Sequence, residues 1–462
     1  MSSSQNRVRL SRFTHFIETG NDYTGILNSL SLDVLVVRRD FAKLLKEVRH
    51  FDFSKIETLM SIQLAEELIK RHLLIPETKS ELDDLKSFQE HLKHAPVGIL
   101  YLILSDACNI NCSYCYFEEA IPANYTFSKM KIETARLGID VFAKILTVSI
   151  SRGLDEPQII IYGGEPLSNW QVLRLSLEYI HKLRESGILP ENTSVTINSN
   201  GTLITEEIAK VLAAFSFVTL AVSIDGPKDI HDFHRVDRMG LGTYDRVHAG
   251  IKMAKTMGVN VGLCCTLTHR NIERAEEILI WMQETYGISS LGFNILLETP
   301  KPIIADRIVY AEKVADKLIS CFLVARKHGI YEDRIMRKVK SFVEGDTYFY
   351  DCGGCGQQLV VSPNGKVGVC QAYCGTKKYF TDLTDGFDPK NHSYWKEWRM
   401  RSPLNMPQCI DCIALGNCGG GCPYSAESRM GSIWSLDDVF CIFSRKTINF
   451  LVRDLIEQMT VK

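Results

Sequence analysis

The chain has 462 residues, 45% of them apolar, and a formal net charge of −2. This length allows about three domains, and no apolar run approaches the ~18 residues of a membrane span. The balanced charge and the lack of a long basic tract argue against a nucleic-acid-binding protein. The first residues, MSSSQNRVRLSRF, lack the apolar stretch of a secretion signal. We therefore expect a cytoplasmic protein whose fifteen cysteines serve metal ligation rather than disulfides.

Residues 1–95 are expected to form a separate N-terminal domain. Two strand-like runs, RFTHFIET and DVLVVR, are joined by the turn-rich segment NDYTGILNSLSL. Helices are predicted around Asp40–Val48 and Ser61–His72, before the short apolar run LLIP. The charged, helix-prone segment Lys79–Lys93 is predicted to connect this domain to the next one.

Residues 96–328 alternate short β-rich runs with amphipathic stretches. The predicted strands are residues 98–105, 158–163, 194–200, 217–225, 260–268 and 290–297. The predicted helices between them are residues 128–146, 171–185, 205–214, 243–257 and 272–286. Such alternation implies right-handed crossovers and a parallel sheet. We expect an α/β fold, a partial (β/α)6 barrel with its active site at the carboxyl ends of the strands.

Three cysteines follow the first of these strands in the run DACNINCSYCYFEEA: Cys108, Cys112 and Cys115. A cubane iron–sulfur cluster normally takes four thiolates, so three on one loop leave one iron open to a chelating cofactor. This spacing, with Tyr114 before the third cysteine, resembles the radical S-adenosylmethionine (SAM) superfamily. The resemblance implies that SAM binds the open iron, is reduced to a 5′-deoxyadenosyl radical, and has its adenine near Tyr114. A zinc site is the alternative, although zinc loops favour cysteine pairs that come in twos.

The second predicted strand ends in Gly163-Gly164-Glu165-Pro166. This run resembles the superfamily motif that binds the amino group of SAM's methionine moiety. Two glycines let the backbone approach closely, and a carboxylate can face an ammonium. In isolation the same four residues would be an ordinary turn.

Polar residues also follow the next two strands. Asn200 follows the third strand, Ser223 and Asp225 end the fourth, and Arg235 lies shortly after them. The resemblance implies that Ser223 contacts the SAM ribose hydroxyls, that Asn200 lines the same cleft and that Arg235 is a partner for the SAM carboxylate. A solvated surface arginine and an asparagine that caps the next helix remain as alternatives.

Residues 329–462 are predicted to form a bridging region and a cysteine-rich domain with nine cysteines between Cys352 and Cys441. Their spacing resembles the SPASM domain, which carries two auxiliary [4Fe–4S] clusters. The resemblance implies an inner cluster on Cys352, Cys355, Cys370 and Cys422. It implies an outer cluster on Cys409, Cys412, Cys418 and Cys441. The family usually separates its first two cysteines differently, so whether Cys352 and Cys355 both ligate stays open, as does a zinc-ribbon-like module.

Four cysteines remain outside these sets. Cys264 and Cys265 are adjacent on the fifth predicted strand, so they must point to opposite faces. Cys321 is expected in the core of a long helix. Cys374 is expected near the inner cluster, where it is a candidate donor of a hydrogen atom or proton.

The order of elements in residues 1–95 resembles the winged-helix peptide-recognition domains that precede the barrel in many peptide-maturing radical SAM enzymes. Such domains bind a leader peptide by β-strand addition; a plain packing or dimerisation domain is the alternative. The resemblance implies three [4Fe–4S] clusters and SAM as cofactors, a ribosomally made precursor peptide as substrate, and flavodoxin or ferredoxin as electron donor. We expect hydrogen abstraction from the peptide, followed by an intramolecular thioether, carbon–carbon or ether cross-link.

Three other functions compete with this prediction. Anaerobic sulfatase-maturing enzymes carry an aspartate as general base where this chain has Gln371, and an amide cannot accept the proton. A peptide epimerase would use Cys374 as its hydrogen donor. An iron–sulfur electron carrier or scaffold is the non-enzymatic alternative, but it has no use for the SAM motifs.

Overall fold

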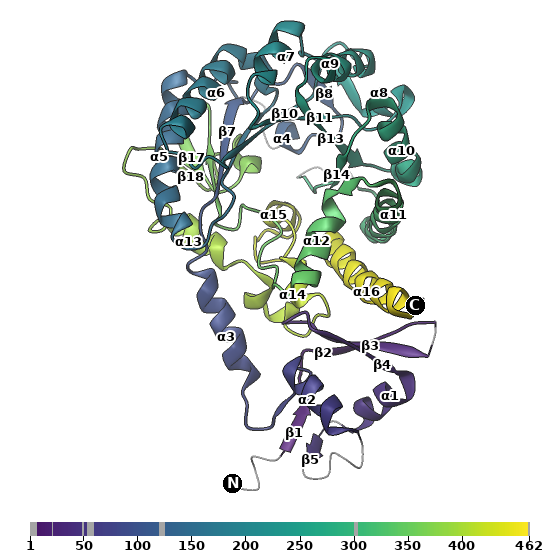
Figure 1. Cartoon of the computed structure of the whole chain (residues 1–462). Coiled ribbons are helices and arrows are strands. Elements are labelled where there is room, and N and C mark those ends of the chain that lie inside the picture. Colours follow the sequence, from purple (N-terminus) through teal and green to yellow (C-terminus); the bar gives the residue numbers. More distant parts are fainter. Residues whose placement is uncertain are drawn as a thin grey trace.

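The computed structural model describes residues 7–20, 22–48, 50–52, 60–119, 125–299 and 304–460. Figure 1 shows a curved sheet with helices on its outer side, and an N-terminal unit at the opposite end of the molecule. The cysteine-rich C-terminal region lies between them. Within the described residues, no helix is long and apolar enough to cross a membrane.

All six strands predicted for residues 96–328 are present, parallel and in chain order within one sheet. They are β7 (Ile99–Ser105), β9 (Gln158–Gly163), β10 (Ser194–Ser199), β11 (Val218–Ser223), β13 (Asn260–Leu267) and β14 (Ser290–Ile295). The sheet is open, with β15 (Tyr331–Glu332) and β18 (Phe380–Asp382) at its two edges. The prediction of an α/β fold built on a parallel sheet is confirmed.

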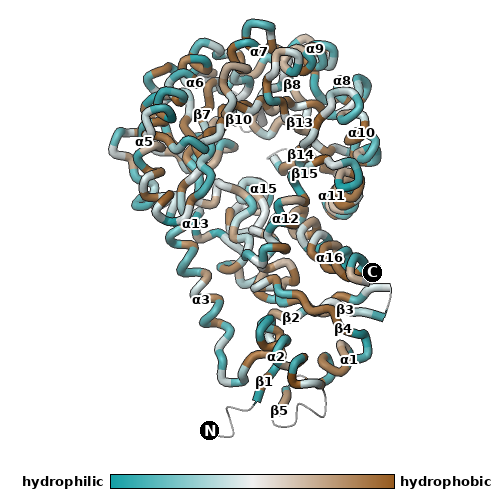
Figure 2. Tube along the Cα trace, in the orientation of Figure 1, coloured by the Kyte–Doolittle hydropathy of each residue, from teal (hydrophilic) through white to brown (hydrophobic). Residues whose placement is uncertain are grey.

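Helices cover the outer face of this sheet (Figure 1). They are α5 (Ile132–Ile150), α6 (Trp170–Glu185), α7 (Glu206–Ala213), α9 (Tyr244–Thr256), α10 (Ala275–Tyr286) and α11 (Arg307–His328). Side chains alternate along each strand: on β10, Val195 and Ile197 are fully buried, whereas Thr196 and Asn198 are only half-buried. Figure 2 shows the same separation, with apolar strands inside and polar helix surfaces outside. The concave face, which we call the lumen, is therefore the polar one.

The C-terminal region continues the same sheet, which the sequence did not predict. Strand β16 (Gln358–Val361) pairs in parallel with β7, and β17 (Lys366–Gly368) and β18 follow in antiparallel order. A four-residue strand is too short for periodicity to reveal. The helices of this region are α12 (Asp333–Glu344), α13 (Ser393–Met400), α14 (Leu415–Cys418), α15 (Pro423–Met430) and α16 (Asp438–Thr460).

The N-terminal unit contains two small antiparallel sheets, ordered β5-β1-β6 and β2-β3-β4. Their strands are β1 (Arg7–Leu10), β2 (Thr14–Glu18), β3 (Tyr23–Asn28), β4 (Val34–Arg38), β5 (His50–Asp52) and β6 (Leu74–Pro76). The helices α1 (Arg39–Glu47), α2 (Ile62–Lys70) and α3 (Glu81–Leu92) lie close to their predicted positions. That this unit is a winged-helix recognition domain stays a prediction.

Three strands of this unit were not predicted: β1, β5, and the central strand β3, which lies inside the segment expected to be a turn-rich connection. Gly25 made that segment look like a turn. In the structure it makes room instead, because a Cβ on Gly25 would lie 2.4 Å from the Cγ1 of Val452 on α16. The glycine therefore lets the C-terminal helix pack directly against β3.

The N-terminal unit also contacts the cysteine-rich region. The amide of Gly416 donates to the carbonyl of Ser29 (2.6 Å), and the Thr347 hydroxyl donates to the carbonyl of Leu30 (2.9 Å). Apolar residues from both parts share one core: Ile17, Leu27, Leu32, Ala414, Ile448, Val452 and Ile456. The unit is therefore packed onto the region that follows the barrel, as well as joined to the barrel by α3 (Figure 1).

Candidate active site

The loop with the first three cysteines begins at the carboxyl end of β7. Its short strand β8 (Ile110–Cys112) pairs antiparallel with β12 (Arg235–Asp237), which places Arg235 opposite Cys112. The three thiols are half-buried. Burial, and then weaker effects that include the neighbouring thiols, raises the pKa of Cys108 to about 11 and that of Cys112 to about 12. The structure thus brings the three predicted ligands together, and we call them the three-thiol loop.

A buried ion pair supports this loop. The guanidinium Nε of Arg235 donates to the Oδ2 of Asp225 at 2.8 Å, and the Tyr114 hydroxyl donates to the same oxygen. The Nη1 of Arg235 lies 3.9 Å from the sulfur of Cys112. Burial alone would raise the pKa of Asp225, but the charge of Arg235 outweighs it and lowers that pKa. Because Arg235 is 7% exposed, the alternative of a solvated surface arginine is wrong.

The two glycines after β9 permit a close approach between backbones. A Cβ on Gly163, whose φ is +141°, would lie 2.1 Å from the carbonyl oxygen of Ser105. A Cβ on Gly164 would lie 2.3 Å from the carbonyl oxygen of Ala107. The glycines are thus required by the segment that leads into Cys108, and Pro166 then starts a short 3-10 helix, Pro166–Asn169.

Glu165 is fully buried and already bonded within the protein. Its carboxylate accepts hydrogen bonds from the amide of Leu167 (2.9 Å), the hydroxyl of Ser199 (2.9 Å) and the amide of Asn200 (2.8 Å). Burial outweighs these bonds and raises the pKa of Glu165 to about 7. In the structure the carboxylate ties the ends of β9 and β10 together, and its contact with a SAM ammonium stays a prediction.

Asn200 contacts the three-thiol loop. Its Nδ2 donates to the Oδ1 of Asn109 (2.9 Å) and lies 3.6 Å from the sulfur of Cys108. The cap of the next helix is Thr205, so the alternative in which Asn200 caps that helix is wrong. Ser223 lies half-buried at the end of β11, opposite Cys264 in the strand register, and its contact with the SAM ribose stays a prediction.

The eight predicted C-terminal ligands fall into two neighbourhoods. Burial raises the pKa of the Cys370 thiol, and the nearby thiols that raise it further are Cys352, Cys422 and Cys355. Burial likewise raises the pKa of Cys441, and the nearby thiols of Cys418 and Cys409 raise it further. The thiol of Cys418 also raises the pKa of Cys412. We call these the inner set (Cys352, Cys355, Cys370, Cys422) and the outer set (Cys409, Cys412, Cys418, Cys441). Both Cys352 and Cys355 lie in the inner set.

The donor chemistry of the three groups fits iron–sulfur clusters. All donors are thiols, the soft ligands that such clusters take, and they are half-buried or buried in the protein. In the part of the chain that the structure describes, no three His, Cys, Asp or Glu side chains are placed to hold a single metal ion.

Three tyrosines occupy the lumen between the three-thiol loop and the inner set. The hydroxyls of Tyr116 and Tyr162 are 2.8 Å apart, and the ring of Tyr101 is 6.0 Å from that of Tyr162. Burial, together with the nearby Cys115 thiol, raises the pKa of Tyr162 to about 12 despite its bond to Tyr116. Burial and then Cys352 raise the pKa of Tyr101. Sequence reasoning missed these residues, although Tyr116 directly follows Cys115 and Tyr162 directly precedes the Gly-Gly motif.

Cys374 and Gln371 are the two residues predicted with catalytic roles. Cys374 is fully buried, its sulfur is 3.9 Å from the Nζ of Lys377, and burial raises its pKa to about 11. The Oε1 of Gln371 accepts a hydrogen bond from the Nε2 of Gln358 (3.2 Å). Their catalytic roles stay predictions.

The other cysteines lie as predicted. Cys265 is buried whereas Cys264, next to it on β13, is half-buried. Cys321 lies in the core, inside α11.

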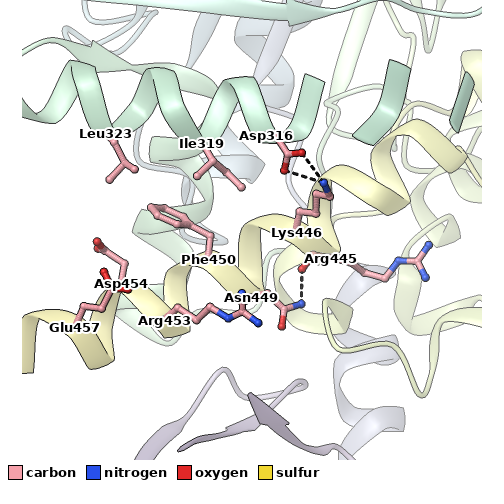
Figure 3. A pocket seen from close by; sticks show the side chains of 10 residues that line it. All are labelled: Asp316, Ile319, Leu323, Arg445, Lys446, Asn449, Phe450, Arg453, Asp454 and Glu457. Atoms are coloured by element: carbon pink, nitrogen blue, oxygen red, sulfur yellow. Dashed lines mark hydrogen bonds and ion pairs between the residues drawn. The ribbon is translucent and has the colours of Figure 1, made fainter. Parts of the chain in front are cut away.

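A surface groove of about 720 Å³ lies apart from these residues, between α11 and α16 (Figure 3). Ile319, Leu323 and Phe450 form its apolar part. An ion pair between Lys446 and Asp316 (2.7 Å) crosses one end. None of the candidate site residues lines this groove.

Several known proteins are similar to this chain in sequence and in fold. Residues 102–282 match the family model described as the radical SAM superfamily. The radical SAM cyclopropyl synthase TigE of Paramaledivibacter caminithermalis is 23% identical over 99% of this chain and 94% of its own length. A cysteine-type anaerobic sulfatase-maturating enzyme of Clostridium perfringens is 24% identical over 74% of this chain and 93% of its own.

Solved structures agree with the sequence matches. Native anSMEcpe with bound AdoMet has a TM-score of 0.59 at 20% identity, over 79% of this chain and 100% of that one. Streptococcus suis SuiB bound to S-adenosylmethionine has a TM-score of 0.51 at 17% identity, over 94% of this chain and 99% of that one. The matched segment contains the three-thiol loop, Glu165 and the Asp225–Arg235 pair. The chain is therefore an enzyme whose residues 102–282 form a radical SAM domain, which binds SAM and a [4Fe–4S] cluster.

Proposed function

We propose that this enzyme removes a hydrogen atom from a ribosomally made precursor peptide and joins two of its side chains by a thioether, carbon–carbon or ether bond. The relatives support a peptide substrate: a solved structure of native anSMEcpe holds AdoMet and the Cp18Cys peptide, with a TM-score of 0.59. TigE, named a cyclopropyl synthase, is matched over almost the whole of this chain, and its name supports the carbon–carbon option.

One observation carries the proposal: the lumen extends from the three-thiol loop to the inner set. Tyr162 lies close enough to Cys115 for the thiol to raise its pKa, and Tyr101 is close enough to Cys352 for the same effect. A side chain held among these tyrosines is therefore near both thiol groups. A cross-link requires both the three-thiol loop and the inner set near the substrate. One hydrogen leaves the substrate as an atom. The second leaves as a proton and an electron, and that electron needs an acceptor.

The chain's own residues position the reacting groups. When bound at the three-thiol loop, SAM and its cluster supply the radical that abstracts the hydrogen. Tyr114, fixed by the hydrogen bond to Asp225, forms a rigid wall beside that loop. The half-buried polar residues Thr196 and Asn198 offer hydrogen-bond partners to an extended peptide. The inner and outer sets complete a proposed complement of three [4Fe–4S] clusters, and a reduced flavodoxin or ferredoxin is the proposed electron donor.

The mass of the product tests this function. Full-length enzyme with SAM and dithionite is incubated without oxygen with candidate precursor peptides encoded beside its gene. A product lighter by about two hydrogens supports the cross-link. A product of unchanged mass that gains one carbon-bound deuterium in deuterated buffer would instead show an epimerase, and would draw attention to Cys374.

Formylglycine formation is the second candidate, because the sulfatase-maturating enzymes match 71–74% of this chain. Gln371 lies where their aspartate base is expected, and its amide is bonded to Gln358. An aldehyde on a serine- or cysteine-containing sulfatase peptide, detected with a hydrazide probe, would support this second function. Absence of the aldehyde together with a cross-linked precursor supports the first.

The edge strand β4 is the proposed binding place for a leader peptide. In the register between β3 and β4, Leu35 and Val37 bond to β3 while the amide of Val36 faces outward. On the opposite edge, β2, Glu18 is paired with Lys46, whose ammonium also lies 5.1 Å from the ring centre of Phe16. Charges of this kind blunt a sheet edge. On β4, the Nη1 of Arg71 donates to the carbonyl of Val34 at 2.8 Å, so strand addition is proposed for the rest of this edge, from Leu35 onward.

A proline scan tests this edge. Val36→Pro removes only an outward-facing amide, which edge strands tolerate, so the fold is retained and peptide affinity falls. Leu35→Pro, the matched control, removes an amide that pairs with β3 and lowers the melting temperature as well. Fluorescence anisotropy of a labelled precursor peptide measures the affinity. Unchanged affinity of Val36→Pro would contradict binding at this edge.

A further inference from the structure

The inner and outer sets share one short loop. Cys418 belongs to the outer set and Cys422 to the inner set, and the three residues between them are glycines with φ values of +74°, +88° and +66°. Such values disfavour any residue with a Cβ. The loop is therefore constrained by its backbone, and whatever holds the loop acts on both sets at once.

Arg401 holds the middle of this loop. It is fully buried, and its Nη1 donates to the carbonyl of Gly420 at 2.7 Å. Its Nε donates to the carbonyl of Ile433, and its Nη2 to that of Ser435 at 3.4 Å. A Cβ on Gly420 would lie 3.0 Å from the same Nη1. The guanidinium is thus enclosed by backbone carbonyls from the two segments that carry Cys422 and Cys441.

The charge of Arg401 reaches thiols of both sets. It hydrogen-bonds to Cys355 and opposes the rise in pKa that burial causes there and at Cys422, both of the inner set. It also opposes the rise at Cys409 of the outer set. The carboxyl of Asp437 lies near Arg401 as well. It accepts hydrogen bonds from the amides of Cys422 (3.2 Å) and Phe440 (3.4 Å) and offsets part of the charge of Arg401.

A second buried cation on the same loop provides a contrast. The Nζ of Lys338 donates to the carbonyl of Cys418 at 2.7 Å and to the Oδ1 of Asp351 at 2.8 Å. Asp351 is ionised, because the lysine and two nearby arginines outweigh burial and lower its pKa to about 2. Lys338 is therefore bonded to a carboxylate, whereas the guanidinium of Arg401 is bonded to backbone carbonyls.

We propose that Arg401 is a positioning residue shared by the two auxiliary clusters, and that its buried charge raises the reduction potentials of both. This inference rests on the proposed function, in which each set holds one [4Fe–4S] cluster. A reduced cluster carries one more negative charge than an oxidised one, so a fixed cation nearby favours reduction. If each set holds a cluster, the inner one would take up the electron that the substrate radical loses, the outer one would accept that electron in turn, and the accompanying proton would leave the substrate.

Anaerobic redox titration of full-length holoenzyme, followed by electron paramagnetic resonance, tests the inference. Arg401→Gln keeps an amide donor but loses the charge, so both auxiliary potentials shift downward, the inner one further because Cys355 is bonded to Arg401. Arg401→Lys keeps the charge and stays nearer to wild type. Lys338→Met combined with Asp351→Asn removes a loop hydrogen bond without changing net charge, and leaves both potentials in place.

Iron content separates the possible failures. Wild-type protein with about four irons and stoichiometric zinc would refute the proposed clusters themselves. Wild-type protein with about twelve irons, and an Arg401→Gln variant with equal iron but unchanged potentials, would overturn only the role of Arg401. An Arg401→Gln variant that loses its auxiliary irons would overturn it as well, because the residue would then serve assembly.

Discussion

The three-thiol loop and the two C-terminal sets hold similar ligands in different surroundings. In the loop, the buried cation is Arg235, whose charge is matched by Asp225 in a buried pair. In the C-terminal sets, the buried cation Arg401 is bonded to backbone carbonyls. The loop also supplies one thiol fewer than a cubane cluster takes. The contrast fits the proposed function, in which the first site admits a cofactor and the two proposed auxiliary sites hold electrons.

The largest expected effect comes from deleting the proposed ligands of either the three-thiol loop or the outer set, but not of both. Replacing Cys108, Cys112 and Cys115 by alanine removes about four of about twelve irons and abolishes SAM cleavage. The matched variant with alanine at Cys409, Cys412 and Cys418 loses the same amount of iron and still cleaves SAM. Iron assays and chromatography of 5′-deoxyadenosine measure both. Loss of SAM cleavage in the second variant as well would contradict the division into two kinds of site.

The buried pair beside the loop gives the next effect. Arg235→Met leaves Asp225 buried without its cation, and breaking such a pair costs about 3–5 kcal/mol of unfolding free energy. Arg235→Met combined with Asp225→Asn removes both charges and recovers part of that loss. Anaerobic urea denaturation measures the free energies. Equal destabilisation by the single and double variants would show that the pair's charges are not what supports the loop.

Glu165 gives a smaller and more specific effect. Glu165→Ala leaves the amides of Leu167 and Asn200 and the hydroxyl of Ser199 without their acceptor, at about 1–3 kcal/mol for a group left unsatisfied. Glu165→Gln keeps an acceptor oxygen and retains more stability. If the carboxylate also contacts the SAM ammonium, Glu165→Gln lowers SAM affinity in calorimetry with iron content unchanged. Wild-type affinity in Glu165→Gln would remove Glu165 from the SAM site.

The smallest predicted effect is a pH dependence of stability. The folded-state pKa of Glu165 is raised to about 7 from its ordinary value of 4.5, so the folded protein binds more protons than the unfolded chain between these values. The stabilisation is fully present below pH 4.5 and is lost as pH rises through 7. Linkage gives about 1 kcal/mol of loss between pH 6 and pH 7. Thermal melts of wild type and Glu165→Gln between pH 6 and pH 7 measure this loss. If the variant loses as much stability over this range as wild type does, Glu165 is not its source.

The sequence predicted the alternating strands and helices of residues 96–328 and the grouping of the cysteines along the chain. Six strands were predicted because short β-rich runs alternate with amphipathic stretches. The strands β3 and β16 were missed because one contains Gly25 and the other is four residues long. Both are set by packing with distant segments, α16 and β7, which local patterns do not record.

The site was predictable where its residues lie in short motifs. The thiols of the two C-terminal sets lie in two neighbourhoods, and their pairing as cluster ligands, implied by the resemblance of their spacing to a known domain, stays a prediction. The Asp225–Arg235 pair, the lumen tyrosines and Arg401 were not predicted as partners. Their roles arise from contacts between elements far apart in the chain, such as that of Arg401 with Gly420 and Ile433, and a single sequence contains no signal for such contacts.

Mössbauer spectroscopy of full-length, iron-57-enriched enzyme tests the central contrast most directly. We predict about twelve irons per chain in [4Fe–4S] clusters. Addition of SAM should change the isomer shift of about one of them, the open iron of the three-thiol loop, and leave the irons of both C-terminal sets unchanged. About four irons per chain, or a change in several clusters on SAM addition, would contradict the account.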